Sequence, residues 1–500
     1  MTDELNRARE CGRRTARQIA ESAKQTEHRP KFHLASPAGW INDPNGFSFF
    51  GGEFHLFFQH HPYSSKWGPM HWGHAVTRDF VRWQDRETAL APDTISDRDG
   101  CFSGTAIDDG GTHLIAYTGV SKFSGEEVQQ QCLASGDGET YTKRAENPVI
   151  TAADVPFPFQ KNHFRDPKIW KEGGTYFLAA VLRKTDGRGA LALFSSENLC
   201  AWKFVSVMDE STGASGMWEC PDFFRLDGTD IIIVSPQEMK ADEARGFHDG
   251  NNSVYMTGTL SRTSFRFARD IRPENGFTAA QIDGGIDFYA PQTALSPDGR
   301  RIMIAWMQSW ESPVTPETLL WSGMMTFPRE LHIKDGRLFQ LPAREIERYR
   351  TNPRHGTLSF SGGGRTEQSL GAVSGRHLDI ELDITPPSGK TGSISFHIAK
   401  DGGSYAELKY DAAHGTLSFD RSRTLTPGAS SFRRMNVSPC KTDGILRLRL
   451  LLDTSSLEVF ANGGAAAFTN VFFMPPSAKG ILVCADAGFS LEYSCFDIEA

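Results

Sequence analysis

The sequence predicts an all-β protein in which a five-bladed β-propeller precedes a C-terminal β-sandwich, with a short N-terminal helix. Three observations indicate this architecture. A strand-rich unit recurs about every 60 residues over some 300 residues, and short apolar strands then alternate with Gly and Ser turns up to the C-terminus. The composition agrees, because 35 Phe and 10 Trp together with 48 Gly and 26 Pro favour short strands and turns over long helices.

The N-terminal extension, residues 1–27, is charged and periodic and predicts a short amphipathic helix. It has no apolar core like that of a signal peptide, so we expect a cytoplasmic protein. No stretch of the chain approaches the roughly 18 uninterrupted apolar residues of a membrane span, so we expect no membrane partner. The sequence carries no signal for an oligomeric state.

The propeller is expected over residues 28–338, because this region contains an internal repeat. Four segments share an apolar start, a hydroxyl residue, a polar turn and a later aromatic residue. Their hydroxyl residues are spaced by 58, 60 and 62 positions: Thr77, Ser135, Ser195 and Thr257. Strand-like runs accompany them, and a fifth follows: FHLFFQ (54–59), THLIAYTGV (112–120), TYFLAAVL (175–182), IIIVSPQE (231–238) and RIMIAWM (301–307). Five such units predict a propeller, in which each blade covers its neighbour; the alternative is a β-sandwich with coincidentally similar turns.

A short helical linker is predicted over residues 339–355, with a Pro near its start and Asn-Pro after its end. The remaining residues, 356–500, alternate apolar strands with Gly and Ser turns, as in HLDIELDI, GSISFHIA and ILRLRLLLD. That pattern predicts an antiparallel β-sandwich. Because it contains few clusters of aromatic residues with carboxylates, we expect this domain to support the propeller.

Charge and cysteine usage exclude several classes of protein. The net charge of −8 argues against a nucleic-acid partner, because such a protein needs a basic face to displace counterions from phosphates. The eight cysteines are scattered and form no C-x-x-C pair, which favours reduced, buried thiols over disulfides or a zinc site.

Three acidic residues share an unusual local setting and are the candidate catalytic groups. Asp43 lies in WINDPNG, Asp166 in FRDPK and Glu219 in WECPDFF, each with an aromatic residue shortly before it and a proline shortly after it. Proline stiffens the backbone and aromatic rings exclude water, so these carboxylates are held in place. Carboxylates that meet at one channel mouth fit glycoside cleavage, in which one acid protonates the leaving oxygen and another attacks the anomeric carbon.

Other interpretations of these residues stay open. Asn-Asp-Pro-Asn-Gly is also turn chemistry, Arg165 beside Asp166 could be a structural ion pair, and Glu219 could be a surface acid. The acids could bind calcium, although no D-x-D-x-D-G loop is present and nearby tryptophans favour a sugar. His71 and His74 are three residues apart, but such residues lie on opposite faces of a strand, so we expect no metal site.

The chain resembles glycoside hydrolase family 32, the group of invertases, sucrose-6-phosphate hydrolases, inulinases and levanases. WINDPNG, FRDP and WECPD resemble the three signature motifs of that family, in the same order. Further similar segments are FFQHHPYSSKWGPMHWGHA, CFSGTA, DFYAPQT, FPREL, LEVFANGG and FTNVFF. The resemblance covers roughly residues 28–500 and implies a five-bladed propeller followed by a β-sandwich.

By this resemblance the protein is a retaining β-fructofuranosidase that hydrolyses the fructosyl bond of sucrose or short fructo-oligosaccharides through a covalent fructosyl–enzyme intermediate. Asp43 is then the nucleophile, Glu219 the general acid and base, and Asp166 the stabiliser of the transition state. The substrate-binding residues implied by matching positions are Asn42, Gln59, Trp67, Phe102, Ser103, Arg165, Asp287 and Gln292, the last two nearer the rim. No cofactor and no metal are implied, so the expected partner is a small sugar.

The retaining route has two physical consequences. A nucleophile has to stay ionised at neutral pH, so we expect the pocket to keep the pKa of Asp43 low. The carboxyl groups of Asp43 and Glu219 are expected to lie about 5 to 5.5 Å apart.

The sequence does not decide between three substrates: sucrose, sucrose 6-phosphate and short fructo-oligosaccharides. A 6-phosphate needs cationic side chains beside the leaving sugar, and the candidates are Lys66, Arg183, Lys184 and Lys240. Transfer of fructose to another sugar is a second possible outcome of the covalent intermediate. A catalytically silent fructan-binding protein is an alternative from a different class, but all three acids are present. A related five-bladed family that inverts arabinans would lack the WINDPNG motif.

Overall fold

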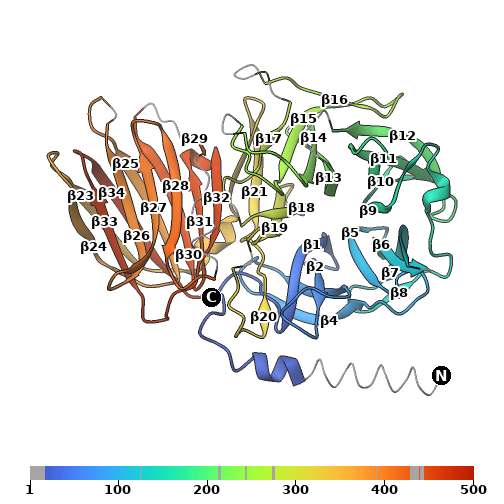
Figure 1. Ribbon diagram of the computed structural model, residues 1–500, viewed down its shortest axis with the longest axis horizontal. Coiled ribbons are helices and arrows are strands. Elements are labelled where there is room, and N and C mark those ends of the chain that lie inside the picture. The colour runs from blue at the N-terminus through green and yellow to red at the C-terminus, as the bar shows by residue number, and fades with distance from the viewer. Residues whose placement is uncertain are drawn as a thin grey trace.

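The computed structural model describes residues 17–500, except residues 124, 212–215, 243–244, 273–275, 277, 286, 313, 390, 428–437 and 440–443. Two all-β parts lie side by side, with the propeller on the right of Figure 1 and the sandwich on the left. The predicted N-terminal helix is described only in part, because residues 17–22 are helical and residues 1–16 lie outside the described residues. Among the described helices, none has the length and apolar character needed to cross a membrane.

Five sheets, counted over the described residues, form the blades of the propeller and stand around a common centre in Figure 1. Blade 1 contains β1 (Gly39–Phe50), β2 (Glu53–His61), β3 (His71–Thr77) and β4 (Gln84–Leu90), with β20 (Trp321–Ser322) beside β1. Blade 2 contains β5 (Gly100–Asp108), β6 (His113–Phe123), β7 (Glu126–Gly136) and β8 (Tyr141–Lys143). The 3-10 helix η1 (Ala152–Asp154) leads to blade 3, which contains β9 (Phe159–Glu172), β10 (Thr175–Lys184), β11 (Gly189–Ser196) and β12 (Lys203–Glu210). Blade 4 contains β13 (Trp218–Leu226), β14 (Thr229–Pro236), β15 (Val254–Leu260), β16 (Phe267–Arg269) and β17 (Ala280–Gln281). Blade 5 contains β18 (Tyr289–Leu295), β19 (Arg301–Trp306), β21 (Arg329–Lys334) and β22 (Arg337–Pro342).

The sequence repeat corresponds to the third strand of successive blades, since its hydroxyl residues lie on β3, β7, β11 and β15. In blades 1 and 3, the same kind of hydrogen bond stabilises the turn that follows this strand. Thr77 Oγ1 accepts a hydrogen bond from the Phe80 N–H at 2.9 Å, and Ser196 Oγ accepts one from the Leu199 N–H at 3.0 Å. Both turns place the apolar residue at positive φ, 62° for Phe80 and 65° for Leu199, and bury its side chain. The five strand-like runs form the second strand of each blade, as the sequence predicted.

Closure of the ring brings the innermost strands together. β1, β5, β9, β13 and β18 contact one another in that cyclic order. The ends of the ring are joined because β20 pairs in parallel with β1, with Trp321 opposite Gly39. Apolar side chains fill the space between blades; Leu133 of blade 2, for example, belongs to the same buried cluster as Phe164 of blade 3. Such burial is the main force that holds one blade against the next.

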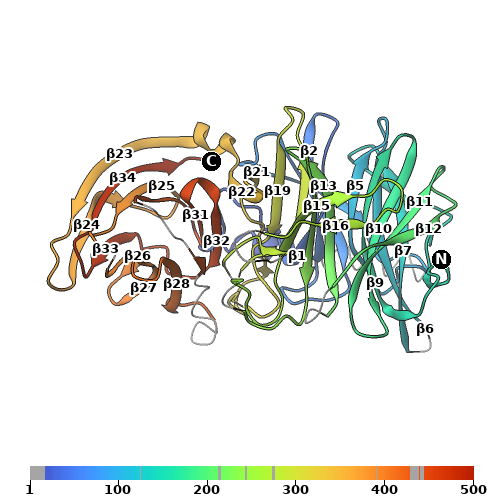
Figure 2. The ribbon, with the colours of Figure 1, turned by 90° about the horizontal axis from the view of Figure 1, so that it is seen from above.

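The C-terminal domain is a sandwich of two six-stranded antiparallel sheets, which Figure 2 shows as two layers. One sheet has the order β23 (Arg350–Ser359), β34 (Ser490–Ile498), β25 (Leu378–Thr385), β30 (Leu446–Asp453), β31 (Ser456–Ala461) and β32 (Ala466–Val471). The other has the order β24 (Thr366–Ser374), β33 (Gly480–Ala485), β26 (Ser393–Asp401), β27 (Ser404–Asp411), β28 (Thr416–Arg423) and β29 (Ser438–Pro439). The 3-10 helix η3 (Asn462–Gly464) joins β31 to β32.

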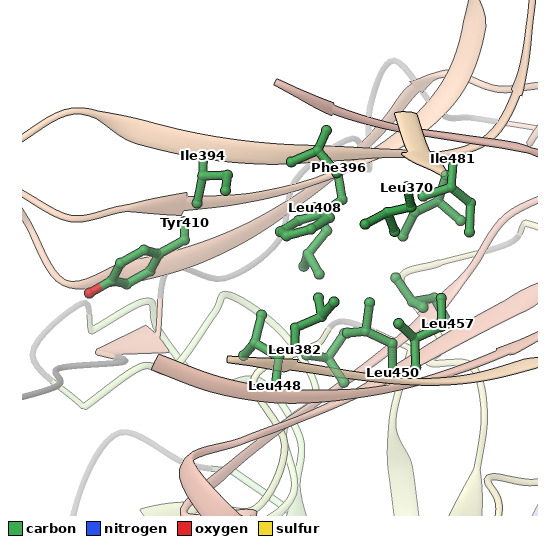
Figure 3. Packing of buried hydrophobic residues seen from close by; sticks show 14 of the residues in the cluster. Leu370, Leu382, Ile394, Phe396, Leu408, Tyr410, Leu448, Leu450, Leu457 and Ile481 are labelled. Carbon is green, nitrogen blue, oxygen red and sulfur yellow. The ribbon is translucent and has the colours of Figure 1, made fainter. Parts of the chain in front are cut away.

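The sandwich core follows from the alternation of buried and less buried side chains along several of its strands, such as the first part of β30. Leu448 and Leu450 of β30 point inward, whereas the two arginines of the same strand lie on its other face. Figure 3 shows Phe396 and Leu408 of the opposite sheet facing these leucines. Each fully buried side chain of this kind contributes roughly 1.5–3 kcal/mol.

The predicted linker, residues 339–355, is largely taken up by strands. β22 extends to Pro342 and pairs with β21, and β23 already begins at Arg350. Only the 3-10 helix η2 (Arg344–Tyr349) matches the helical prediction. The physical reason is that residues 337–342 alternate exposed or partly exposed side chains with buried ones and complete the outer edge of blade 5.

Buried charges join the two domains. Arg329 of β21 donates a hydrogen bond to Asp283 (Nη1 to Oδ2, 2.8 Å) and another to Glu458 of β31 (Nε to Oε2, 3.1 Å). His33 lies between Asp453 (Nδ1 to Oδ2, 2.8 Å) and Glu458 (Nε2 to Oε1, 2.9 Å), and all five side chains are buried. Burial lowers the pKa of His33, but hydrogen bonds to the two carboxylates outweigh burial and raise it to about 9. The stabilisation by His33 is therefore complete below about pH 6.5 and is lost as the pH rises through about 9.

Arg329→Met is expected to lower the free energy of unfolding by about 3–5 kcal/mol, because Asp283 and Glu458 stay buried and lose their cation. Urea or thermal unfolding measures the loss. The matched control is Arg348→Met, since Arg348 is exposed, and it should stay within about 0.5 kcal/mol of the wild type. A loss at Arg329 no larger than that of the control would show that the buried network does not stabilise the domain interface.

Candidate active site

Each of the five innermost strands carries a β-bulge, and the three candidate acids lie at three of these bulges. The register shifts between Ile41 and Pro44 in β1, Phe102 and Gly104 in β5, Arg165 and Lys168 in β9, Glu219 and Asp222 in β13, and Tyr289 and Gln292 in β18. A bulge bends the strand and re-aims its side chains, and it is common beside active sites. Four of the bulges contain or adjoin a proline, which an innermost strand tolerates because only one neighbouring strand pairs with it at that point.

The backbone is strained at three of these bulges. Asp166, Cys220 and Ala290 have φ values of 60°, 47° and 54°, and each directly precedes a proline. Residues other than glycine rarely adopt such angles, and where they do the surrounding structure has to enforce them. The strain therefore indicates side chains that are held in one orientation.

Asp43 presents one bonded and one free carboxylate oxygen. Its Oδ2 accepts a hydrogen bond from Ser103 Oγ at 2.7 Å and one from the Cys220 thiol at 3.4 Å. Its Oδ1 has no hydrogen-bond partner among the residues that the structure describes. The carboxylate is thus anchored through one oxygen, and the other is left for a reacting atom.

Cys220 connects Asp43 with the second candidate acid. The Cys220 backbone N–H donates to Asp166 Oδ2 at 2.9 Å, and its sulfur lies 3.8 Å from the same oxygen. On the other side, the Asp166 N–H donates to Thr118 Oγ1 at 2.8 Å. Burial, together with the neighbouring carboxylates, raises the pKa of the Cys220 thiol well above its usual value, so the thiol stays protonated and can donate.

Glu219 is held by a cation and a phenol. Arg165 donates from Nε at 3.2 Å and from Nη2 at 3.0 Å to Glu219 Oε1, and the Tyr289 hydroxyl donates to Glu219 Oε2 at 2.6 Å. Arg165 Nε also lies 3.9 Å from Asp166 Oδ2. The Glu219 side chain keeps 16% of its surface exposed, so the group faces open space while its orientation is fixed. The structure therefore brings Asp43, Asp166 and Glu219 into one cluster.

The electrostatics of the cluster overturn one expectation. Burial, and then the nearby charge of Glu219, raise the pKa of Asp43, although hydrogen bonds such as that from Ser103 oppose the rise. The prediction that the pocket keeps the pKa of Asp43 low is therefore wrong for the protein without bound substrate. Burial likewise raises the pKa of Asp166 to about 7, against the effect of Arg165. Carboxylates this close resist being ionised together, which leaves a proton available within the cluster.

Two of the predicted sugar-binding residues, Ser103 and Arg165, contact these acids directly, and Asn42 directly precedes Asp43. Trp40 Nε1 donates to Asn42 Oδ1 at 2.8 Å, and Gln59 Nε2 donates to the Cys101 carbonyl at 3.0 Å. Both amides are buried and fixed. Trp67 and Phe102 pack edge to face with ring centroids 6.3 Å apart, and half of the Trp67 surface is exposed. An exposed ring of this kind suits the apolar face of a sugar.

Two predicted residues are buried and bonded within the fold. Asp287 is fully buried, and its carboxylate binds Arg421 of the sandwich at 2.6 Å and the Val471 N–H at 2.8 Å. The structure thus places Asp287 in the domain interface, which corrects its expected place at the pocket rim. Gln292 is also buried and bridges blades, because it donates to the Gly104 carbonyl at 2.9 Å and accepts from the Phe47 N–H at 3.3 Å.

Cys220 and Tyr289 are site residues that the sequence analysis missed. Aligning the prolines of the inner strands would have found both. The residues directly before a proline are Asp43, Asp166, Cys220 and Ala290, and those two before it are Asn42, Arg165, Glu219 and Tyr289. Cys220 contacts the two acids of the first set, and Tyr289 contacts Glu219 of the second.

Three of the four cations proposed for a phosphate are already paired with acids. Arg183 binds Glu238 at 2.9 Å, Lys184 binds Glu210 at 3.0 Å, and Lys66 lies 3.7 Å from Glu317. The fourth, Lys240, is exposed.

Known proteins with similar sequences and structures cover almost the whole chain. The model of the glycosyl hydrolases family 32 N-terminal domain matches residues 33–342, and the model of the family 32 C terminal matches residues 345–498. A sucrose-6-phosphate hydrolase of Escherichia coli is 35% identical over 469 residues, which cover 92% of this chain and 93% of that protein. A raffinose invertase of Escherichia coli is 35% identical over 477 residues, 92% of each chain. The solved structure of a mutant Bombyx mori GH32 β-fructofuranosidase in complex with sucrose is 30% identical, with a TM-score of 0.80 over 97% of this chain and 98% of that one.

Proposed function

The chain belongs to glycosyl hydrolases family 32, and from this premise we propose that it is a retaining β-fructofuranosidase. It hydrolyses the fructosyl bond of sucrose or short fructo-oligosaccharides through a covalent fructosyl–enzyme intermediate. The observation that supports this function is the convergence of Asp43, Asp166 and Glu219, with Cys220 between the first two and Arg165 between the last two.

In the proposed first step, Asp43 Oδ1 attacks the anomeric carbon of the fructosyl unit while the bond to the leaving oxygen breaks. Glu219 gives its proton to that oxygen, so the leaving sugar departs as a neutral alcohol. Ser103 and Cys220 suit this role of Asp43, because they hold the other oxygen and leave Oδ1 free.

In the second step, a water molecule attacks the same carbon and Glu219 takes its proton, which releases fructose and restores the Asp43 carboxylate. Arg165 and Tyr289 keep the carboxyl group of Glu219 in place through both steps. Asp166 is proposed to accept hydrogen bonds from the fructosyl hydroxyls and to stabilise the positive charge of the transition state.

The names of the relatives include both sucrose-6-phosphate hydrolase and raffinose invertase, so sucrose 6-phosphate is the second candidate substrate. A non-catalytic fructan-binding protein has no support, since all three acids are present and converge. A cytoplasmic location, transfer of fructose to other sugars and the separation of the two catalytic carboxyl groups stay predictions.

Fructose release from sucrose, sucrose 6-phosphate, 1-kestose, inulin and levan at equal concentrations tests the function. We expect release from sucrose and 1-kestose at the highest kcat/KM. If methanol is added, it attacks the fructosyl–enzyme intermediate in place of water, and the retaining route predicts methyl β-fructofuranoside as the product. Capture as the α anomer would contradict the covalent route, and no release from any of the five substrates would contradict the function.

A further inference from the structure

A second ion pair lies close to the proposed acid, and the proposed mechanism does not use it. Arg183 Nη1 donates to Glu238 Oε1 at 3.2 Å, and Nη2 donates to Oε2 at 2.9 Å. Two parallel hydrogen bonds of this kind fix both groups in one plane. The Glu238 side chain is 58% exposed and that of Arg183 only 22%, so the carboxylate is the outer partner.

Glu238, one member of the pair, lies just beyond β14, the strand that pairs with the strand of Glu219. Glu219 lies on β13, whose ladder with β14 continues past the end of β14, since the Gln237 N–H donates to the Met217 carbonyl at 2.8 Å. Glu238 comes directly after Gln237 and crosses over Gly216. A Cβ at Gly216 would meet Glu238 Oε2 at 2.3 Å, so a larger residue there would displace the carboxylate from its present position.

Arg183, the other member of the pair, lies on β10, which pairs with the strand of Arg165. β10 pairs Val181 with Arg165, and Arg183 follows two residues further along the same strand. His163 lies between the two arginines: Arg165 Nη1 is 3.1 Å from His163 Nδ1, and after burial the charges of both arginines lower the pKa of His163. Both arginines therefore lie near His163, and Arg165 also binds Glu219.

Glu238 is also strained, with φ at 58°. A residue with a side chain is disfavoured in this conformation, and strain of this kind concentrates at ligand-binding sites. Here the conformation carries the carboxylate over Gly216 to Arg183.

We propose that Arg183 and Glu238 form one wall of the subsite for the leaving sugar, and that the Glu238 carboxylate selects a neutral sugar over a 6-phosphorylated one. The inference rests on the proposed function, because the leaving sugar is the group that Glu219 protonates. The pair offers hydroxyl groups both donors and acceptors. A phosphate would meet the negative charge of Glu238 first, and Arg183 is already neutralised.

The test compares kcat/KM for sucrose and for sucrose 6-phosphate in the full-length enzyme. The wild type is expected to prefer sucrose. Glu238→Gln keeps the shape of the side chain and removes its charge, so it should shift the preference about tenfold toward sucrose 6-phosphate. The matched control is Glu210→Gln, because Glu210 of β12 pairs with Lys184, the residue after Arg183 on β10, and its preference should equal that of the wild type.

A second variant, Glu238→Gly, removes the carboxylate and the backbone strain together. It should show the same shift with an unchanged or higher melting temperature. Inhibition by glucose 6-phosphate, relative to glucose, should strengthen in both variants, since each product occupies the leaving-sugar subsite. A wild type that prefers sucrose 6-phosphate, or an unchanged preference in both variants, would overturn the inference alone. A wild type that releases fructose from none of the five substrates named above would overturn the proposed function and the inference with it.

Discussion

Replacing Asp43 with Asn is expected to lower kcat for sucrose by about 10⁴-fold or more, because an amide cannot form the covalent bond to the anomeric carbon. The fold should persist. The substitution removes a carboxylate whose pKa is raised by burial and by Glu219, so the melting temperature should stay equal or rise. Steady-state kinetics and thermal unfolding of the purified variant measure both effects.

The matched control for this change is Asp270→Asn, because Asp270 is an exposed acid at the far end of blade 4. It should keep the turnover of the wild type. Mass spectrometry of rapidly quenched enzyme adds an independent readout, since an adduct of one fructosyl unit should appear in the wild type and be absent from Asp43→Asn. Turnover near the wild-type value in Asp43→Asn would refute the assigned nucleophile.

Replacing Glu219 with Gln is expected to lower kcat/KM for sucrose by about 10²–10⁴-fold, the usual contribution of a general acid. The glutamine oxygen can still accept from Arg165, so the geometry of the site should survive. The loss should shrink for a fructoside whose leaving group needs no proton. Added azide should then restore turnover of that substrate, because azide attacks the intermediate without a general base.

Glu197→Gln serves as the matched control, since Glu197 is an exposed acid in a turn of blade 3. It should show neither the loss nor the response to azide. An equal loss for good and poor leaving groups in Glu219→Gln would mean that Glu219 does not protonate the leaving oxygen.

The propeller could be predicted from the sequence because its repeat has a local cause. Thr77 and Ser196, the latter one residue after the aligned Ser195, bind backbone N–H groups only three residues away, so hydroxyl residues recur where the same turn recurs. Alternation along the first part of β30 likewise indicated the sandwich, since Leu446, Leu448 and Leu450 are buried and Arg447 and Arg449 between them are not. The linker was harder to predict, because Pro342 belongs to a strand whose partner is β21.

The candidate site was only partly predictable. Asp43, Asp166 and Glu219 stood out by their proline and aromatic neighbours. Asp287 did not behave as its motif implied, because its carboxylate binds Arg421, which lies 134 residues further along the chain. Tyr289, in the same motif, is the residue that reaches Glu219.

By itself, the sequence determined the strand periods, the turns and the fold class and singled out the three acids as candidates, since each of these depends on residues within a few positions of one another. Only the tertiary structure decided that the pKa of Asp43 rises, that Asp287 binds Arg421 in the domain interface and that Glu238 binds Arg183. The physical reason is that burial and charge act through space, and ring closure sets the distances between blades.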